Sequence, residues 1–308
     1  MENAKWKMLV VIILLGCSLN VDAAIYKKAG TTVGQVLEFG VGARACAMGE
    51  AFTGLADDFS AFYWNPAGIA QIEDLEFNFM HNDWFQGIRY ELVSTVLPLE
   101  EELGAMGLSI IVLKADDIVG RDTNGNFTSN FEAKDSVMSL SFGQRWNDKI
   151  LIGATIKRIN LHIENEGDTQ FAFDAGGLYK FQNTDLTLGV VVQNIGKKIK
   201  FIEKEERLPL NFKLGILYKM LEKRVLLTSD LSKSIDRALK LNLGTEIIIN
   251  SMAKLRFGYN STNDAGSGFT AGIGLKIKDI IELDYAYIPY GELGDSQRIS
   301  LTTKFKAE

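Results

Sequence analysis

Two histidines are the first residues of this chain to examine for catalytic chemistry. His81 and His162 each lie near the end of a stretch that is predicted to form a β-strand. A Ser–His hydrolase needs one of them beside a serine and beside a carboxylate or amide that orients the imidazole. No spacing in the sequence brings such a set together, so we predict that the chain is not an enzyme.

An acidic run begins like a calcium-binding loop but does not continue as one. After Asp122, Phe127 stands where the loop needs its glycine, and Ala133 stands where the closing glutamate belongs. Asn124-Gly125 is better interpreted as a tight turn. The sequence has no Cys/His cluster with metal-ligand spacing and no glycine motif in a nucleotide-binding context. We therefore expect no metal and no cofactor.

Charged side chains recur at alternate positions in several segments, which places them on one face of each predicted strand. Glu246 would face Lys254 and Arg256 across a short turn, so we expect a cross-strand ion pair. In a barrel these groups would point into the lumen, where they must pair or stay hydrated, and their mixed signs predict no ion preference. They are either a structural network or a polar channel lining. The predicted lumen-facing charges are Asp174, Glu246, Lys254, Arg256, Glu282, Asp284 and Arg298, with Lys213 and Lys304 on the same faces.

Residues 40–70 differ from the rest of the chain because they are rich in small residues and lack strand alternation. Asp57 or Asp58 can cap a short helix, since a carboxylate accepts the free amide hydrogens of a first turn. Pro66 disfavours helical backbone at Asn65, so this helix should end there and a turn should follow. These features predict a compact, partly helical element that precedes a sheet.

From residue 75 to the end of the chain, apolar and polar residues alternate with a period of two, as in strands with one apolar face. Each predicted strand is about 10–14 residues long, which suits a tilted membrane strand of about 9–11 residues. Alternation alone does not exclude a soluble sandwich. The fourteen predicted strands span 75–85, 87–99, 104–114, 136–147, 149–162, 169–181, 184–194, 208–219, 223–232, 238–249, 252–261, 267–277, 279–289 and 296–306.

The predicted connections alternate in length along the chain. Those after the even-numbered strands are short, and those after the odd-numbered strands are longer, up to 21 residues at 115–135. The first connection, near Gln86, is the exception. Short turns on one rim and long loops on the other are typical of outer-membrane barrels, and soluble all-β folds have no reason to alternate in this way.

The first 23 residues are predicted to be a signal peptide. Two lysines precede the apolar run 8–15, which is too short to span a bilayer as a helix, and small residues then favour cleavage after Ala23. The alternative is a lipoprotein site at Cys17, which would tether the chain. Both predict export. No later stretch of 18 or more apolar residues exists, so the exported chain could enter a membrane only as a closed barrel.

Composition excludes several other classes of protein. The net charge is −6, from 33 basic and 39 acidic residues, which gives no reason to expect nucleic acid as a partner. A hydrophobic content of 46% is too high for a disordered chain. If Cys17 is removed, Cys46 alone cannot form an internal disulfide.

The segment from Gly42 to Gly68 resembles the start of the FadL superfamily of outer-membrane barrels, and more closely its PorV/PorQ branch. The resemblance implies a fourteen-stranded barrel, in agreement with the strand count, and an N-terminal element that folds into the barrel as a plug. The matching residues are Gly42, Ala43, Arg44, Ala45, Met48, Gly49, Ala51, Phe52, Ala56, Asp57, Asp58, Ala61, Tyr63, Trp64, Asn65, Pro66, Ala67 and Gly68. The plug motif then consists of Arg44, Met48, Gly49, Asp57, Asp58, Asn65, Pro66 and Gly68.

Together these observations predict an all-β protein, an antiparallel transmembrane β-barrel of about 14 strands with a small, partly helical N-terminal plug. The predicted divisions are a signal peptide at 1–23, the plug at 24–74 and an outer-membrane barrel at 75–308.

Besides outer-membrane lipid, the resemblance implies secretion-system components or secreted proteins as partners, in a type IX-like role in protein secretion or surface attachment. The alternative is FadL-like passive transport of hydrophobic small molecules. The chain is short for a FadL transporter and lacks room for large extracellular loops, which favours the first role.

Overall fold

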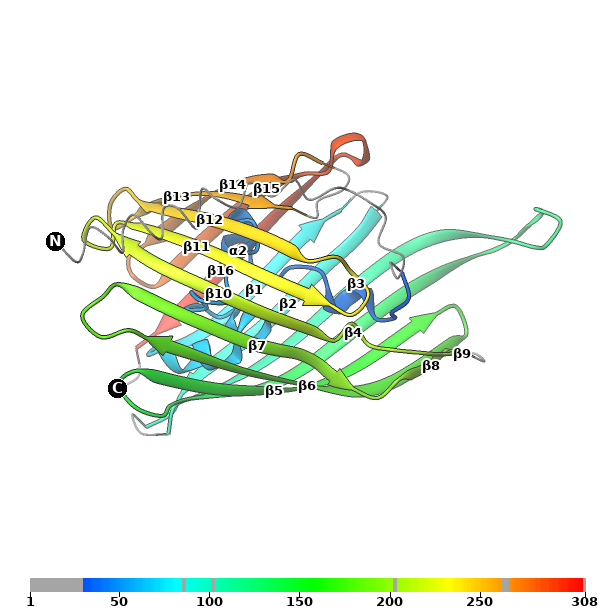
Figure 1. Ribbon diagram of the computed structural model, residues 1–308. Helices are drawn as coiled ribbons and strands as arrows, with labels where there is room; N and C mark the ends of the chain where they lie inside the picture. Colours follow the sequence, from blue (N-terminus) through cyan, green and yellow to red (C-terminus); the bar gives the residue numbers. More distant parts are fainter. Residues whose placement is uncertain (1–29, 85–86, 101–102, 202–203, 262–265, 307–308) are drawn as a thin grey trace.

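Fourteen antiparallel strands form one closed barrel in the computed structural model, which describes residues 30–84, 87–100, 103–201, 204–261 and 266–306 (Figure 1). The predicted signal peptide and Cys17 lie outside the described residues. Each barrel strand pairs with its neighbours along the chain, and β1 closes the barrel on β16 from Leu75↔Phe305 to Asp83↔Gln297. The predicted all-β barrel of fourteen strands is thereby confirmed. Among the described helices, none is long and apolar enough to cross a bilayer.

The strands lie close to the predicted segments. They are β1 (Leu75–Asp83), β2 (Ile88–Pro98), β3 (Ala105–Arg121), β4 (Phe127–Arg145), β5 (Ile150–Ile163), β6 (Glu166–Lys180), β7 (Leu186–Gly196), β10 (Asn211–Met220), β11 (Val225–Ser234), β12 (Lys240–Ile248), β13 (Ala253–Asn260), β14 (Phe269–Ile277), β15 (Ile281–Pro289) and β16 (Asp295–Phe305). The short strands β8 (Ile199–Phe201) and β9 (Lys204–Glu206) form a separate hairpin between β7 and β10. A 3-10 turn, η4 (Gly291–Leu293), connects β15 to β16.

The predicted alternation of loop lengths is wrong at the connections after β3 and after β5. The stretch 115–135 is not a long loop, because β3 and β4 continue through it as a paired hairpin that ends in the turn 122–126 and projects beyond the rim (Figure 1). The connection between β5 and β6 is likewise only residues 164–165. Sequence patterns underestimate strands that leave the barrel wall, because these strands lose the strict apolar–polar alternation that burial on one side imposes.

The two faces of the barrel wall have opposite character. Side chains that point outward form an apolar surface that includes Phe79, Phe257 and Ile273, each between 43% and 51% exposed. The alternate side chains point inward and include the predicted charges, among them Glu246 and Arg256, which are at most 1% exposed. Along β12–β14 the barrel is therefore apolar on its outer surface and largely polar on its inner surface, which is the reverse of a water-soluble protein.

Residues 30–74, which we call the N-terminal segment, fold largely inside the barrel (Figure 1). The segment contains η1 (Gln35–Leu37), α2 (Ala43–Ala47), α3 (Ala61–Trp64) and η2 (Pro66–Gln71). The predicted cap of α3 by Asp57 or Asp58 is wrong: the N-cap residue is Ser60, and Asp58 Oδ1 accepts from the N–H and hydroxyl of Ser60 and not from an amide of the helix. The turn predicted at 65–68 is the first turn of η2.

Candidate functional site

The candidate site is the boundary between the N-terminal segment and the inner wall of the barrel. Along this boundary the barrel strands carry inward-facing glycines, so the two backbones approach closely. A Cβ atom at these positions would overlap the segment: Gly143 and Gly153 meet Pro66, Gly189 and Gly215 meet Thr53 and Gly54, and Gly244, Gly258 and Gly272 meet residues 47–49. Because only glycine leaves this space, the barrel wall is shaped around the segment.

Two glycines of the predicted plug motif are required by the geometry. Gly49 has φ +63 and donates its N–H to Thr270 Oγ1 at 3.1 Å, while its carbonyl accepts from Asn242. A Cβ atom on Gly68 would overlap the carbonyl of Ala56. Met48, which precedes Gly49, is completely buried against Gly244.

Asn65 connects the segment to the wall and begins η2. Its Nδ2 donates to the carbonyls of Thr53 at 3.0 Å and Gly177 at 3.1 Å, and its Oδ1 accepts from the N–H of Ala67. Pro66 occupies the first position of η2, where its fixed φ and missing N–H cost nothing. The Asn-Pro pair of the motif is thus both a helix start and a cross-link between two parts of the fold.

Arg44 joins the predicted plug motif to the predicted lumen charges. Its Nε and Nη2 donate to both carboxylate oxygens of Glu246 at 2.8 and 2.9 Å, which is the bidentate geometry in which arginine binds a carboxylate most strongly. Its Nη1 contacts Asp57 Oδ1 at 2.6 Å and Asp58 Oδ2 at 3.2 Å. One guanidinium therefore binds two carboxylates of its own segment and one of β12.

The same network continues around the wall. Arg256 Nε donates to Glu246 Oε2 at 2.7 Å, as the sequence predicted, and Arg256 Nη1 contacts Asp284 Oδ1 at 2.5 Å. Lys254 binds Glu282 at 2.6 Å and not Glu246. We refer to Arg44, Asp57, Asp58, Glu246, Arg256 and Asp284 as the Arg44 network.

The remaining predicted charges lie apart from the Arg44 network. Asp174 pairs with Lys157 at 2.6 Å and accepts from the N–H of Asn194. Arg298 donates to the carbonyl of Gly40 and to Cys46 Sγ at 2.9 Å. Each predicted lumen charge therefore contacts a protein group, which favours structural pairing over an open charged channel.

Burial and neighbouring charges together shift the pKa values of groups in the N-terminal segment. Burial alone would lower the pKa of Arg44, but Asp57 and Glu246 raise that pKa well above its usual value, so Arg44 stays charged. Burial would raise the pKa of Glu50, but the Lys240 ammonium at 2.5 Å lowers it below the usual value. Burial raises the pKa of Cys46 to about 11, so it remains a thiol at neutral pH.

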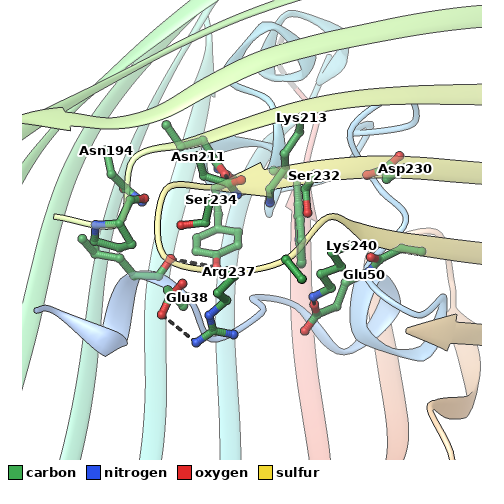
Figure 2. Close-up of a pocket in the computed structure, with 17 residues that line it drawn as sticks. Glu38, Glu50, Asn194, Asn211, Lys213, Asp230, Ser232, Ser234, Arg237 and Lys240 are labelled. Carbon is green, nitrogen blue, oxygen red and sulfur yellow. Dashed lines mark hydrogen bonds and ion pairs between the residues drawn. The ribbon is translucent and has the colours of Figure 1, made fainter. Parts of the chain in front are cut away.

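A small polar cavity of about 60 Å³ lies between η1, α3 and strands β7, β10, β11 and β12 (Figure 2). Ion pairs border it, with Glu38 bound to Arg237 at 2.7 Å and Glu50 bound to Lys240. Lys213 Nζ lies 4.5 Å from the centre of the Trp64 ring, a cation–π contact. No carboxylate among the described residues lies within ion-pair distance of Lys213. The cavity has room for a few water molecules or a small ion.

The part of the lumen opposite β12–β15 is mostly apolar. Inward side chains of β2 to β5, among them Leu92, Ile111 and Val137, form one buried cluster with Phe59 and Phe62 of the N-terminal segment. The inner wall is therefore mostly apolar along β2–β4, where buried Ser94, Ser109 and Ser139 lie among the apolar side chains, and it is charged along β12–β15.

Several residues of the boundary were missed by the sequence analysis. Asp230 of β11 accepts from the N–H groups of Phe52 and Thr53 at 2.9 and 2.8 Å, and Lys157 binds Asp174. Both lie at inward positions of their strands, so the same alternation would have identified them. The partners of Asp230 lie 177 and 178 residues away in the sequence, a contact that no local pattern encodes, whereas Lys157 and Asp174 lie on the paired strands β5 and β6.

Groups of three or more His, Cys, Asp or Glu side chains that could hold a metal ion do not occur among the described residues. His81 contacts Asp83 and Glu91 through its ring nitrogens, at 3.3 and 3.5 Å, and all three side chains are partly exposed to solvent. This arrangement contains no nucleophile.

Residues 17–143 match the uncharacterised protein family UPF0164, a match over less than half of the 308 residues. No curated protein sequence matches the chain. The Ralstonia pickettii toluene transporter TbuX is similar in structure, with a TM-score of 0.64 and 13% identity over 86% of this chain and 98% of that chain.

Two further solved structures are similar over most of their length. The Pseudomonas putida toluene transporter TodX gives a TM-score of 0.59 at 12% identity, covering 87% of this chain and 99% of that chain. A Pseudomonas aeruginosa FadL homologue gives 0.60 at 14%, covering 90% of this chain and 100% of that chain. At these identities the likeness concerns the fold, which is that of the FadL-type outer-membrane channels.

Proposed function

We propose that this protein resides in an outer membrane and lets small hydrophobic molecules pass inward through the barrel. The apolar outer surface suits a bilayer, and the proteins of similar fold are named as toluene transporters. These names support the transport alternative over the secretion role that the motif alone favoured. A membrane location and an exported chain are part of this proposal.

The apolar side of the lumen carries the proposal. Leu92, Ile111 and Val137 line the inner wall where β2, β3 and β4 face the N-terminal segment. A hydrophobic molecule that enters between the N-terminal segment and this wall would replace the apolar contacts between them with its own. Its passage would not require a charged group to lose its hydrogen-bond partners or its water. The ion pairs with β12–β15 would keep the N-terminal segment attached to the barrel while the segment moves away from the apolar wall.

Uptake of a radiolabelled monoaromatic hydrocarbon, by cells that express the protein and lack their own channels of this kind, tests the proposal. We expect faster uptake than with an empty vector, and no gain for a hydrophilic solute of similar size, because the N-terminal segment occupies the lumen. Equal hydrocarbon uptake with and without the protein would refute transport.

A matched pair of variants tests the route. Val137→Thr adds a hydroxyl to the apolar inner wall and should slow uptake by roughly fivefold, equivalent to about 1 kcal/mol for a poorly paired hydroxyl. Val190→Thr makes the same change on the outer face of β7, where the side chain is 49% exposed, and should have no effect. Equal effects of both changes would argue against passage along this wall.

A PorV/PorQ-like role in handling secreted proteins is a second candidate, and the projecting β3–β4 hairpin favours it. β3 pairs with β2 only as far as Ala115, and β4 pairs with β5 only as far as Ala133. Beyond these residues no strand of the described residues pairs with either outer edge of the hairpin, apart from the Glu164 N–H that donates to the Glu132 carbonyl. An unpaired edge can accept a strand from another protein.

Replacement of residues 117–131 by a two-residue turn separates the two functions. If the hairpin binds secretion components or secreted proteins, pull-down from a strain that has such machinery should recover them with the full chain and not with the shortened chain. Hydrocarbon uptake should be the same for both chains. Recovery of neither class of partner by the full chain would remove this candidate.

A further inference from the structure

A concave apolar groove of about 570 Å³ runs over the outer surface of β1–β6, opposite the apolar part of the lumen. Its floor and walls include Leu108, Ile110, Met138, Leu140 and Phe171, all between 41% and 57% exposed. Ligand pockets commonly measure about 300–1,000 Å³, so the groove is large enough for an extended apolar chain.

One charged side chain, Arg158, also lines this groove. On β5 it is paired in register with Met138 of β4 and Phe171 of β6, so apolar side chains flank it on both sides. It is exposed and points outward, like Ile156 two residues earlier. A guanidinium on a lipid-facing surface is costly unless an anion or water solvates it.

Arg158 differs from the other outward cations at this end of the barrel. Lys114 binds Asp116 and Glu132 at 2.8 and 2.9 Å, and Arg89 binds Asp116. Among the described residues, no carboxylate lies within ion-pair distance of Arg158. Its guanidinium therefore remains available to an external anion.

The outward carboxylates near this end of the wall have partners of their own. Glu91 of β2 contacts His81, and Glu132 of β4 binds Lys114. Lys134 of β4 is also exposed, and no ion pair joins it to a carboxylate of the described residues. Arg158 is therefore the one side chain lining the groove that carries a charge, and no carboxylate of the described residues pairs with it.

We propose that the groove binds a phosphate-bearing membrane lipid, with an acyl chain along the apolar floor and the phosphate held by Arg158. Arginine binds phosphate oxygens through two parallel N–H donors, and the apolar floor adjoins it directly. The combination of an unpaired cation inside the groove and a continuous apolar floor fits a lipid better than a soluble anion or an uncharged hydrocarbon. The inference rests on the proposed membrane location and does not depend on transport.

Binding can be measured on the purified full chain in an uncharged detergent by native mass spectrometry. Three probes are compared: dioctanoyl phosphatidate, dioctanoylglycerol with the same chains, and inorganic phosphate. We expect phosphatidate to bind about fivefold or more tightly than dioctanoylglycerol, since one cation near a membrane surface contributes about that factor. Inorganic phosphate alone should bind weakly.

Arg158→Gln should reduce phosphatidate affinity to the level of dioctanoylglycerol. Lys149→Gln, at the β4–β5 turn on the other rim, where the side chain is partly exposed, is the matched control and should change nothing. Heat-modifiable migration on gels confirms that each variant is folded, and unchanged hydrocarbon uptake by Arg158→Gln separates this inference from the transport proposal. Equal binding of the two lipids, unchanged binding by Arg158→Gln, or tight binding of inorganic phosphate alone would overturn it.

Discussion

Arg44→Met should destabilise the folded barrel by about 3–5 kcal/mol, because it removes the cation that binds both oxygens of buried Glu246 and also the half-buried Asp57 and Asp58. Arg44 is 8% exposed and Glu246 only 1%, so water cannot replace the lost partner at Glu246. Arg256 still binds Glu246, but Asp57 and Asp58 lose the cation that connects them to the wall. The loss should release the N-terminal segment from the charged side of the lumen.

Urea unfolding in detergent, followed by heat-modifiable migration, measures this loss of stability. Arg89→Met is the matched control, since Arg89 pairs with Asp116 near the rim with both side chains about a third exposed or more. An exposed pair contributes only about 0–1 kcal/mol. Arg44→Lys should lose part of the stability, because lysine keeps the charge but not the bidentate contact. Equal effects of Arg44→Met and Arg89→Met would contradict the role assigned to the Arg44 network.

Gly258→Val should push the N-terminal segment away from the wall and open the lumen to hydrophilic solutes. An added Cβ would lie 2.6 Å from the Cα of Gly49, closer than real Cβ contacts allow, and the opposing atoms are backbone that cannot rotate away. Overpacking of this kind costs about 1–3 kcal/mol, and displacement of the segment is the way to relieve it.

Two measurements detect this displacement. Uptake of a hydrophilic solute should rise above wild type, and a maleimide should label Cys46, which is fully buried with a raised thiol pKa when the segment is in place. Gly177→Val is the matched control, because its Cβ would lie 3.7 Å from Leu151 O and Val190 Cγ2 in ordinary contact. If Gly258→Val leaves both Cys46 labelling and solute uptake at wild-type levels, the close fit between wall and segment is not required.

The period-two alternation determined most of the fold. A strand with one apolar and one polar face must place these faces on opposite sides of a sheet. The sequence alone therefore predicts fourteen such strands and the face on which each side chain lies. The prediction erred at 115–135, where β3 and β4 extend beyond the barrel. Beyond the rim, both faces of the hairpin lie in similar surroundings, so apolar and polar residues no longer alternate.

The sequence by itself identified two sets of residues, the motif from Arg44 to Gly68 and the charges from Asp174 to Arg298. It also paired Glu246 with Arg256, because that contact crosses a single tight turn and local register determines it. Only the tertiary structure joined the two sets, through the contact of Arg44 with Glu246, 202 residues apart. Such a contact depends on how the N-terminal segment lies inside the closed barrel, and the spacing of residues along the chain carries no record of that placement.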